Sequence, residues 1–371
     1  MKIQKVAVLP CHMPQSDPKW RFSIHANRVS KGWLVELIGA DGTTGYGYAS
    51  ATRHMGANSE GLKGTLDEFV KLLVGRESSD IEDILVTLDH HLKGMNQAKA
   101  AIDCALHELN ARALNVPLYQ LFGGKRREQL PVMRVLSLKA PEEMARKGLE
   151  LVAAGYTHIK IKVEGDVTLD AARVKAIRKA VGSQIRLIID ANQAFKPKEA
   201  ILLAQKVVDD GVEIFEQPCK SDDYAGLKLV TQNSPIAIEA DESAGSVHEV
   251  MQLVAHRIVD MVSLKVPKLG GLRNTLAAAR ICEAGDIPYR LGAHVGPRLL
   301  TAQAMHLAAS LPHLSFACEF GEFVRLENDI TEGVENINGF VTLSQKSGSG
   351  ASLRADAAAH IAAAERILAT V

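Results

Sequence analysis

Seven short apolar runs in the stretch from Gly155 to Gly321 each end on one ionisable residue. In chain order these residues are Lys162, Asp190, Glu216, Asp241, Lys265, His294 and Glu319. They recur at intervals of 24 to 29 residues, about the length of a strand, a loop, a helix and a return loop. Parallel strands would bring all seven side chains to one end of a sheet. The repeat therefore predicts a shared site with carboxylates in the middle and lysines on either side.

Three consecutive carboxylates predict a metal site. Asp190, Glu216 and Asp241 end adjacent strands, so their side chains can converge. Three negative charges in one confined site need a cation. Carboxylate oxygens suit Mg²⁺, and Mn²⁺ would also fit. Asn192, two residues after the first carboxylate, is a candidate to support the ligands or to contact the substrate, and Glu242 is a candidate partner of the ligands.

The lysines predict proton transfer at carbon. Lys160 and Lys162 differ by two positions and point to the same face of their strand, while Lys265 lies four strands further on. Near a dication and another lysine, the ammonium form is disfavoured, so a lysine becomes a usable base. A substrate between Lys162 and Lys265 can lose a proton from one face and regain it on either face. We expect Lys160 to polarise the substrate carboxylate rather than to act as the base.

Helical patterns separate the apolar runs, for example over 170–181, 197–209, 246–256 and 272–284. Strands that alternate with helices predict a parallel sheet. One more apolar run, Val132–Leu138, precedes the others and makes eight strands. Eight such strands close into a barrel whose active site lies at the carboxyl ends of the strands. No good helix follows Glu319, so the last helix of the barrel is expected to be missing.

The ends of the chain predict a second unit. Antiparallel strands are expected over 2–8, 32–38 and 44–48, followed by helices over 59–73, 81–92 and 98–114. A strand over 339–343 and a helix over 355–371 are expected to fold back on this unit. The predicted organisation is a capping domain of residues 1–125, a barrel of 126–325 and a returning tail of 326–371.

Two loops of the capping domain supply further candidates for contact with a substrate. Trp20 and Phe22 lie in the loop over 13–27, and His54 lies in the loop over 50–60. A long loop in a compact domain is often a lid. These residues are candidates only because they lie in these loops, and the alternative is that they pack against the protein without contacting a substrate.

Composition excludes several classes of partner. The chain has 371 residues, with 43 Lys+Arg and 43 Asp+Glu, so nothing indicates a basic surface for nucleic acid. No apolar run reaches membrane-spanning length, and the first residues alternate like a strand rather than forming a signal peptide. Five scattered cysteines favour free thiols in the cytoplasm. A small carboxylate is the expected partner.

As a set, five motifs resemble the enolase superfamily, and more narrowly its muconate-lactonizing (muconate cycloisomerase) subgroup, relatives of mandelate racemase. The motifs are Lys160-Ile161-Lys162, Asp190-Ala191-Asn192, Glu216-Gln217-Pro218, Ala240-Asp241-Glu242-Ser243, and Asp260 to Lys265 followed by Gly270-Gly271. The resemblance covers nearly the whole chain. It implies an α/β fold, a modified TIM barrel of type (β/α)₇β with an α+β capping domain, and a homo-oligomer from dimer to octamer. It also implies one Mg²⁺ and abstraction of the proton α to a carboxylate, through an enediolate.

Several interpretations stay open from the sequence. Lysines on both faces favour racemisation or epimerisation of an amino-acid derivative or dipeptide. The alternatives are cycloisomerisation of a muconate-like diacid, syn-dehydration with one lysine, and a scaffold barrel without catalysis. His294 is a substrate contact, a second acid or a structural histidine, and Glu319 binds substrate or pairs with a lysine. Lys268 is expected to be a solvated loop residue.

Overall fold

Seven parallel strands and one further extended segment close a barrel in the computed structural model, which describes residues 1–21 and 28–362. Residues 314–319 join the two edges of the seven-stranded sheet by parallel bridges, from Leu314 and Glu319 to β13 and from Cys318 to Val132. The predicted eighth strand therefore completes the barrel through isolated bridges rather than a regular ladder. From one edge of the sheet to the other, the strands are β7 (Met133–Leu136), β8 (His158–Lys162), β9 (Arg186–Asp190), β10 (Val212–Glu216), β11 (Ala237–Ala240), β12 (Met261–Lys265) and β13 (Tyr289–Gly292).

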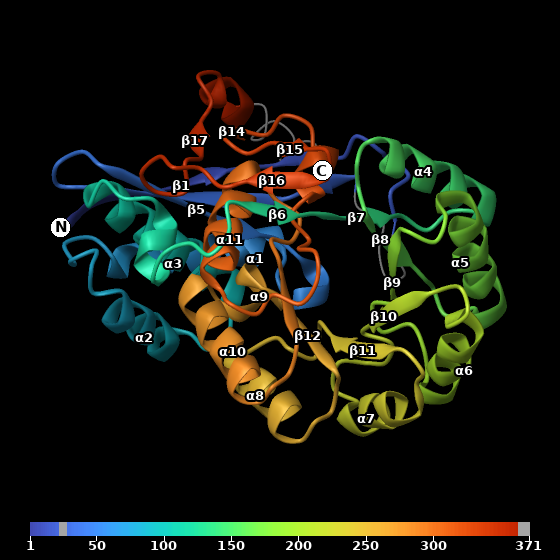
Figure 1. The fold of residues 1–371 in the computed structure, drawn as a ribbon. Helices are drawn as coiled ribbons and strands as arrows, with labels where there is room; N and C mark the ends of the chain where they lie inside the picture. The colour runs from blue at the N-terminus through green and yellow to red at the C-terminus, as the bar shows by residue number, and fades with distance from the viewer. Residues whose placement is uncertain (22–27, 363–371) are drawn as a thin grey trace.

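Helices follow these strands and cover the outside of the barrel (Figure 1). They are α4 (Pro141–Ala153), α5 (Val167–Val181), α6 (Pro197–Val207), α7 (Tyr224–Asn233), α8 (Val247–Ala255), the short α9 (Val266–Leu269), α10 (Leu272–Ala284) and α11 (Arg298–Ser310). After residues 314–319, the described chain continues into one 3₁₀ turn, η4 (Glu322–Arg325), in place of an eighth helix. The predicted (β/α)₇β barrel is confirmed.

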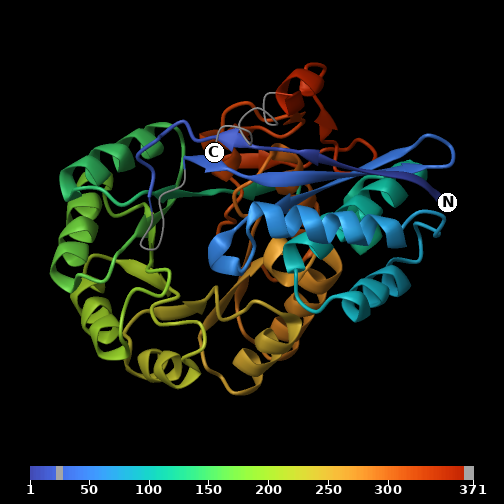
Figure 2. The same ribbon diagram turned by 180° about the vertical axis from the view of Figure 1, so that it is seen from behind.

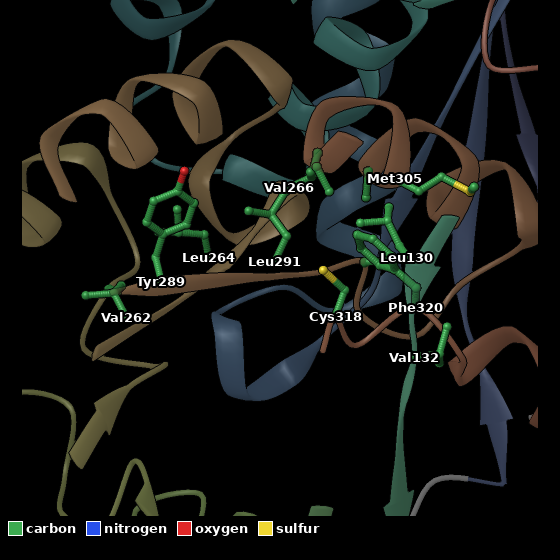
Figure 3. Packing of buried hydrophobic residues seen from close by; sticks show 14 of the residues in the cluster. Leu130, Val132, Val262, Leu264, Val266, Tyr289, Leu291, Met305, Cys318 and Phe320 are labelled. Atoms are coloured by element: carbon green, nitrogen blue, oxygen red, sulfur yellow. The ribbon is translucent and has the colours of Figure 1, made fainter. Parts of the chain in front are cut away.

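Alternation along the strands separates the apolar wall from the interior. Figure 3 shows Val262 and Leu264 of β12 with Tyr289 and Leu291 of β13 in the buried apolar layer beside the helices. Because successive side chains point to opposite faces, the residues between them face the inside of the barrel. A small apolar cluster fills one level of that interior, and it comprises Met133, Ile188, Ile214, Met261, Phe316 and Ala317. Two positions after Ile188 and Ile214 of this cluster, the same strands carry Asp190 and Glu216, which face the same interior.

The capping domain consists of an antiparallel sheet and helices packed against it (Figure 2). The sheet has the order β1-β4-β5, and the short pair β2-β3 lies between β1 and β4 in sequence. The strands are β1 (Ile3–Pro10), β2 (Met13–Pro14), β3 (Val29–Ser30), β4 (Gly32–Gly39) and β5 (Thr44–Ser50). The helices are η1 (Arg53–Met55), α1 (Ser59–Phe69), η2 (Val70–Leu72), α2 (Ile81–His91), α3 (Asn96–Ala113) and η3 (Leu118–Phe122).

The C-terminal segment lies beside the N-terminal strands in both ribbon views (Figures 1 and 2). Its strand β16 (Phe340–Thr342) pairs with β15 (Asn336–Ile337) and with β6 (Gln129–Pro131), and β14 (Thr331–Glu332) pairs with β17 (Ser352–Leu353). Arg112 of α3 donates a hydrogen bond to the carbonyl of Ala351 at 2.7 Å. Residues 357–362 are helical, and the rest of the helix predicted to residue 371 lies outside the described residues. The exact division at residues 125 and 325 stays a prediction.

No helix in the described part of the chain is long and apolar enough to cross a membrane.

Close packing of β5 on α3 depends on Gly47. A Cβ atom at this position would lie 1.9 Å from the carbonyl oxygen of Ala101, which belongs to the backbone of α3. Backbone has little freedom to give way in a packed interface, so a larger residue here would push the helix off the sheet. A Cβ atom at the exposed Gly64 of α1 would have no neighbouring heavy atom within 4 Å, so the same change there meets no obstacle.

We predict opposite effects for the same substitution at these two glycines. Gly47→Ala should lower the free energy of unfolding by about 1–3 kcal/mol, the usual cost of overpacking. Gly64→Ala should raise it by about 0.5–1 kcal/mol, because alanine loses less entropy than glycine in a helix. Urea unfolding followed by circular dichroism measures both. A destabilised Gly64→Ala variant would show that the packing argument is not what separates the two sites.

Candidate functional site

A layer of buried charge fills the mouth of the barrel. Lys162, Asp190 and Glu216 lie at the ends of three neighbouring strands, and the ladders pair Lys162 with Asp190 and Asp190 with Glu216. Glu216 is in turn the ladder partner of Glu239, two residues before Asp241. The side chains of all five are buried. The three predicted carboxylates thus come from β9, β10 and the segment just after β11, which are neighbours in the sheet.

Lys160 lies at the centre of these carboxylates. Its Nζ is 2.9 Å from Asp190 Oδ2, 2.8 Å from Glu216 Oε2 and 2.6 Å from Glu319 Oε2. Lys160 donates a hydrogen bond to Glu319 and forms ion pairs with the other two, so three carboxylates surround one ammonium group. Lys160 is therefore held in a fixed position, as expected for an electrostatic role.

The two lysines predicted to transfer protons contact different carboxylates. Lys162 Nζ is 2.5 Å from Asp190 Oδ2 and 2.6 Å from Asn192 Oδ1. Lys265 Nζ is 2.6 Å from Asp241 Oδ2 and 3.9 Å from Glu216 Oε1. Both lysines also line the same cavity. The structure therefore brings together the two lysines and the three carboxylates that the sequence singled out.

The ionisation of these groups reflects their mutual charges. Burial raises the pKa of Asp190, but Lys160 and Lys162 outweigh it and leave the pKa at about 2. Burial and the neighbouring Asp190 together raise the pKa of Glu216 to about 8. Burial lowers the pKa of Lys265, but the charges of Asp241 and Glu319 hold it above its usual value. In the protein alone, Lys265 is thus an ammonium, and the free amine predicted above requires a nearby dication.

Residues 1–21 and 28–362 contain no group of three or more His, Cys, Asp or Glu side chains arranged around one point as metal ligands. The reason is visible in the contacts: ammonium groups of Lys160 and Lys265 lie between the carboxylates. The donor set nevertheless fits a hard cation. Glu216 Oε1 is buried without a hydrogen-bond partner, and the raised pKa of this residue shows that negative charge there is under-compensated. A dication between Asp190, Glu216 and Asp241 would give this oxygen a partner and would compensate the negative charge of Glu216.

A cavity of about 490 Å³ lies over this charged layer. Its floor includes Lys160, Lys162, Asp241 and Lys265 from the barrel. Its rim comes from the capping domain and includes residues on β3, after β5 and at the start of α1. A small molecule in the cavity would touch both domains, with the charged groups of the barrel on one side of it.

Family comparisons agree with this arrangement. The family described as mandelate racemase / muconate lactonizing enzyme, N-terminal domain, matches residues 5–123, and the enolase C-terminal domain-like family matches residues 143–357. The chain belongs to the enolase superfamily. The resemblance inferred from the five motifs is thereby confirmed, and residues 124–142 lie between the two matches.

Similar proteins are isomerases of this superfamily. An L-Ala-D/L-Glu epimerase from Clostridium acetobutylicum is 34% identical over 354 residues, covering 94% of this chain and 98% of its own. The chloromuconate cycloisomerase CbnB from Cupriavidus necator is 31% identical over 97% of this chain and 99% of its own. The solved dipeptide epimerase from Enterococcus faecalis V583, complexed with Mg and the dipeptide L-Leu-L-Tyr, has a TM-score of 0.91 and 32% identity, covering 95% of this chain and 100% of that one. The predicted enolase-superfamily isomerase is confirmed.

The predicted substrate contacts have different outcomes. Asn192, His294, Glu319 and Trp20 all line the cavity of this superfamily member. Glu319 forms an ion pair with Lys160, which favours the interpretation that it pairs with a lysine over the one that it binds substrate. Phe22 lies outside the described residues, as does the side chain of His54. The roles of all these residues stay predictions.

Lys268 is not the solvated loop residue that the sequence indicated. It lies on α9 and is 4% exposed. Its Nζ donates to Asp241 Oδ1 at 2.6 Å and to the carbonyl of Ser263 at 2.9 Å. The short helix α9 begins directly after Lys265 and turns the chain back toward Asp241, which the expectation of a loop could not anticipate. Lys268 and Lys265 therefore hold the two oxygens of one carboxylate.

Gln217 is a site residue that the sequence argument left without a role. Its φ is 33°, its Oε1 accepts hydrogen bonds from the backbone of Asp241 and Ser243, and its Nε2 donates to Ser243 Oγ. The side chain after one carboxylate thus fixes the backbone of another. The available signal was its position between Glu216 and Pro218 in a motif, since a polar amide directly after a buried strand needs partners.

Arg290 of β13 is the second such residue. It is fully buried, and its Nη2 contacts Glu216 and lies 2.7 Å from Glu239. An arginine in the middle of an apolar run was itself the signal, because arginine is almost never fully buried unless it is paired. Arg290 contacts Glu216 and is not one of the residues that line the cavity.

We predict that Arg290→Met strongly destabilises the protein. The substitution puts an apolar chain in place of the cation that Glu216 and Glu239 share, so that Glu216 depends on Lys160, and breaking a buried pair costs about 3–5 kcal/mol. Urea unfolding measures the change. Arg146→Met, which breaks an exposed helix pair with Glu150, should leave the free energy of unfolding nearly unchanged. Equal effects of the two substitutions would contradict the assigned role of Arg290.

Proposed function

We propose that this protein removes the proton α to the carboxylate of a small substrate in the presence of Mg²⁺, and most readily racemises or epimerises an amino-acid derivative or dipeptide. The observation that carries the proposal is the pair Lys162 and Lys265. They stand on strands four apart in the barrel order, both line one cavity, and the carboxylates lie between them. The epimerases among the relatives support the same reaction class.

Asp190, Glu216 and Asp241 would hold the metal ion. Bound there, Mg²⁺ would supply positive charge that stabilises an enediolate form of the substrate carboxylate. Lys160 adds a further fixed positive charge beside the same carboxylates. The substrate carboxylate is therefore expected to face this part of the floor, with its α-carbon between the two remaining lysines.

Proton transfer would be shared by Lys162 and Lys265. One lysine accepts the proton as a neutral amine, and the other, as an ammonium, returns a proton to the opposite face of the carbon. Burial lowers the pKa of Lys265, but Asp241 and Glu319 hold it above its usual value, so Lys265 carries a proton that it can return. With the roles exchanged, the same pair converts the opposite enantiomer, so the reaction is reversible.

A second candidate is lactonising cycloisomerisation of a muconate-type diacid. The chloromuconate cycloisomerase that covers 97% of this chain supports it. This reaction and a syn-dehydration each need one lysine rather than two. The dependence on Lys265 therefore separates epimerisation from its alternatives. The assembly state is likewise a proposal, a homo-oligomer by analogy with the family.

We predict that Lys265→Ala separates proton exchange from inversion. With Mg²⁺ in D₂O, Lys162 should still exchange the α-proton of one enantiomer with solvent, while conversion to the other enantiomer falls by at least about a hundredfold, at the lower end of the usual contribution of a general acid. Proton NMR on pooled N-acyl amino acids, dipeptides, sugar acids and muconates measures exchange, and chiral chromatography measures inversion.

Lys162→Ala should show the mirror-image result with the other enantiomer. The exposed Lys206→Ala on α6 is the matched control and should retain both activities. Undiminished inversion in Lys265→Ala would exclude the two-base mechanism. Loss of the α-proton signal without any inversion in the unmodified protein would favour the one-lysine alternatives.

We also predict that Mg²⁺ binding requires Glu216. Isothermal calorimetry should show binding to the unmodified protein and an affinity at least about tenfold weaker in Glu216→Gln, since loss even of a group that supports a ligand costs that much. Glu213→Gln, on the same strand but paired with the solvent-accessible Arg186, should bind Mg²⁺ normally. Absence of binding to the unmodified protein would favour a scaffold barrel without catalysis.

A further inference from the structure

The capping domain is fastened to the barrel through the first turn of α3. Asn96, the first residue of this helix, donates hydrogen bonds from Nδ2 to two carbonyls of the barrel, that of Lys268 at 2.8 Å and that of Gly245 at 3.0 Å. Lys268 lies on α9, which follows β12, and Gly245 lies between β11 and α8. One side chain of the cap thus joins two barrel segments that follow neighbouring strands.

These two segments carry charged groups of the floor. The helix α9 begins directly after Lys265, and Gly245 follows Asp241 by four positions. The Nζ of Lys265 is 2.6 Å from Asp241 Oδ2, so the placement of the two segments relative to each other sets this contact. Asn96 does not line the cavity over the floor, and its influence on the lysine therefore passes through the backbone.

The two sides of this contact are held in different ways. Asp241 is fixed within the barrel, because its backbone N–H donates to Gln217 Oε1 at 2.9 Å. The helix α9 has four residues, too few to be stable alone. Its last two carbonyls accept hydrogen bonds from Asn96 and, at Leu269, from Asn274 Nδ2 at 2.9 Å. Loss of the Asn96 amide should therefore displace α9 more than it displaces Asp241.

A second residue on the same face of α3 continues this attachment. Asp103 follows Asn96 by seven positions, about two helical turns, and is fully buried. Its Oδ2 accepts a hydrogen bond from the backbone N–H of Leu272, the first residue of α10. A Cβ atom at Gly271 would lie 2.3 Å from the same oxygen, so the backbone between α9 and α10 approaches α3 closely. This face of α3 therefore fixes the corner formed by α9 and α10.

Side-chain packing around Asn96 is incomplete. The half-buried Asn96 lines two further cavities, of about 750 Å³ and 320 Å³, to which both domains contribute residues. A segment beside a cavity has fewer van der Waals contacts to hold it in place. Directional hydrogen bonds across the gap then determine more of its position.

We propose that Asn96 is a positioning residue that holds α9 so that Lys265 stays in place for proton transfer. The inference rests on the proposed function, in which Lys265 serves one face of the substrate. Lys162, which serves the other face, contacts Asp190 and Asn192, and neither belongs to the segments that Asn96 joins. Loss of Asn96 should thus impair one face of the reaction and spare the other.

Amide hydrogen exchange followed by mass spectrometry tests the placement of α9 without any substrate. The N–H of Gly271 donates to the carbonyl of Val266 at 2.9 Å and so reports whether α9 is closed. Asn96→Ala keeps a good helix former in α3. It should speed exchange in a peptide over 266–271 by at least about threefold, as expected when hydrogen bonds that hold a segment are lost, and leave β8 unchanged.

The effect on Lys265 is measured by α-proton exchange in D₂O at saturating Mg²⁺, followed by proton NMR. The two enantiomers of the compound that exchanges fastest in the panel above are tested separately, and Lys265→Ala identifies the enantiomer that depends on Lys265. For that enantiomer, Asn96→Ala should slow exchange about ten- to a hundredfold, since a misplacement of about 1 Å can cost that much, and it should change the other by less than about twofold.

Asn110→Ala is the matched control. Asn110 is also half-buried on α3 and also donates from Nδ2 to a backbone carbonyl, that of Ser78 at 2.7 Å, but this bond stays within the capping domain. Its loss should change neither the amide exchange of α9 nor the ratio between the enantiomers. A general weakening of the cap would affect both asparagine variants alike.

Faster amide exchange over 266–271, with a defect confined to the enantiomer that depends on Lys265, would support the positioning role. Unchanged amide exchange in Asn96→Ala, equal losses for both enantiomers, or the same changes in Asn110→Ala would overturn it. If the unmodified protein exchanges α-protons and Asn96→Ala does so equally well, the proposed function stands while this inference fails. If the unmodified protein exchanges none in the whole panel, the proposed function fails, and the role of Asn96 toward Lys265 fails with it.

Discussion

The barrel mouth is built around charge that is buried and must be balanced internally. Five carboxylates and five cations share this layer, each of them nearly inaccessible to solvent. The carboxylates are Asp190, Glu216, Glu239, Asp241 and Glu319, and the cations are Lys160, Lys162, Lys265, Lys268 and Arg290. An unpaired buried charge is expensive, so each member depends on the position of its neighbours. The barrel, which supplies one or two of these residues per strand, is what makes such a layer possible.

The barrel forms the floor of the cavity, and the capping domain forms its rim. The floor is rigid, because the backbone of Asp241 is held by Gln217 and its two oxygens by Lys265 and Lys268. The rim is formed by short strands and turns, where exposed cations meet solvent. Loops of this kind can change without disturbing a packed core. The proposed chemistry would therefore belong to the floor, and residues of the rim could set the choice of substrate.

The sequence predicted the barrel and the layer of charge because both leave a periodic signal. An apolar run that ends on an ionisable residue specifies a strand and the edge where its charge lies, as for Asp190 and Glu216. It did not predict which lysine pairs with which carboxylate, since pairing depends on strand order and side-chain reach. Lys268 was misjudged for this reason: α9 returns it to Asp241. The sequence shows Arg290 within a predicted strand, but its partners Glu239 and Glu216 lie 51 and 74 positions away in the chain.

The equal numbers of carboxyl groups and basic groups in this layer bear on how a lysine becomes a base. In the protein alone, Lys265 keeps its proton because Asp241 and Glu319 outweigh the effect of burial on its pKa. A dication bound by Asp190, Glu216 and Asp241, with all five carboxylates ionised, would leave the layer with two excess positive charges. That excess is relieved by an anionic substrate, by loss of a proton from a lysine, or by both. Metal binding, carboxylate binding and formation of the free amine are therefore expected to be coupled, and the arrangement of charge in the mouth is the physical reason.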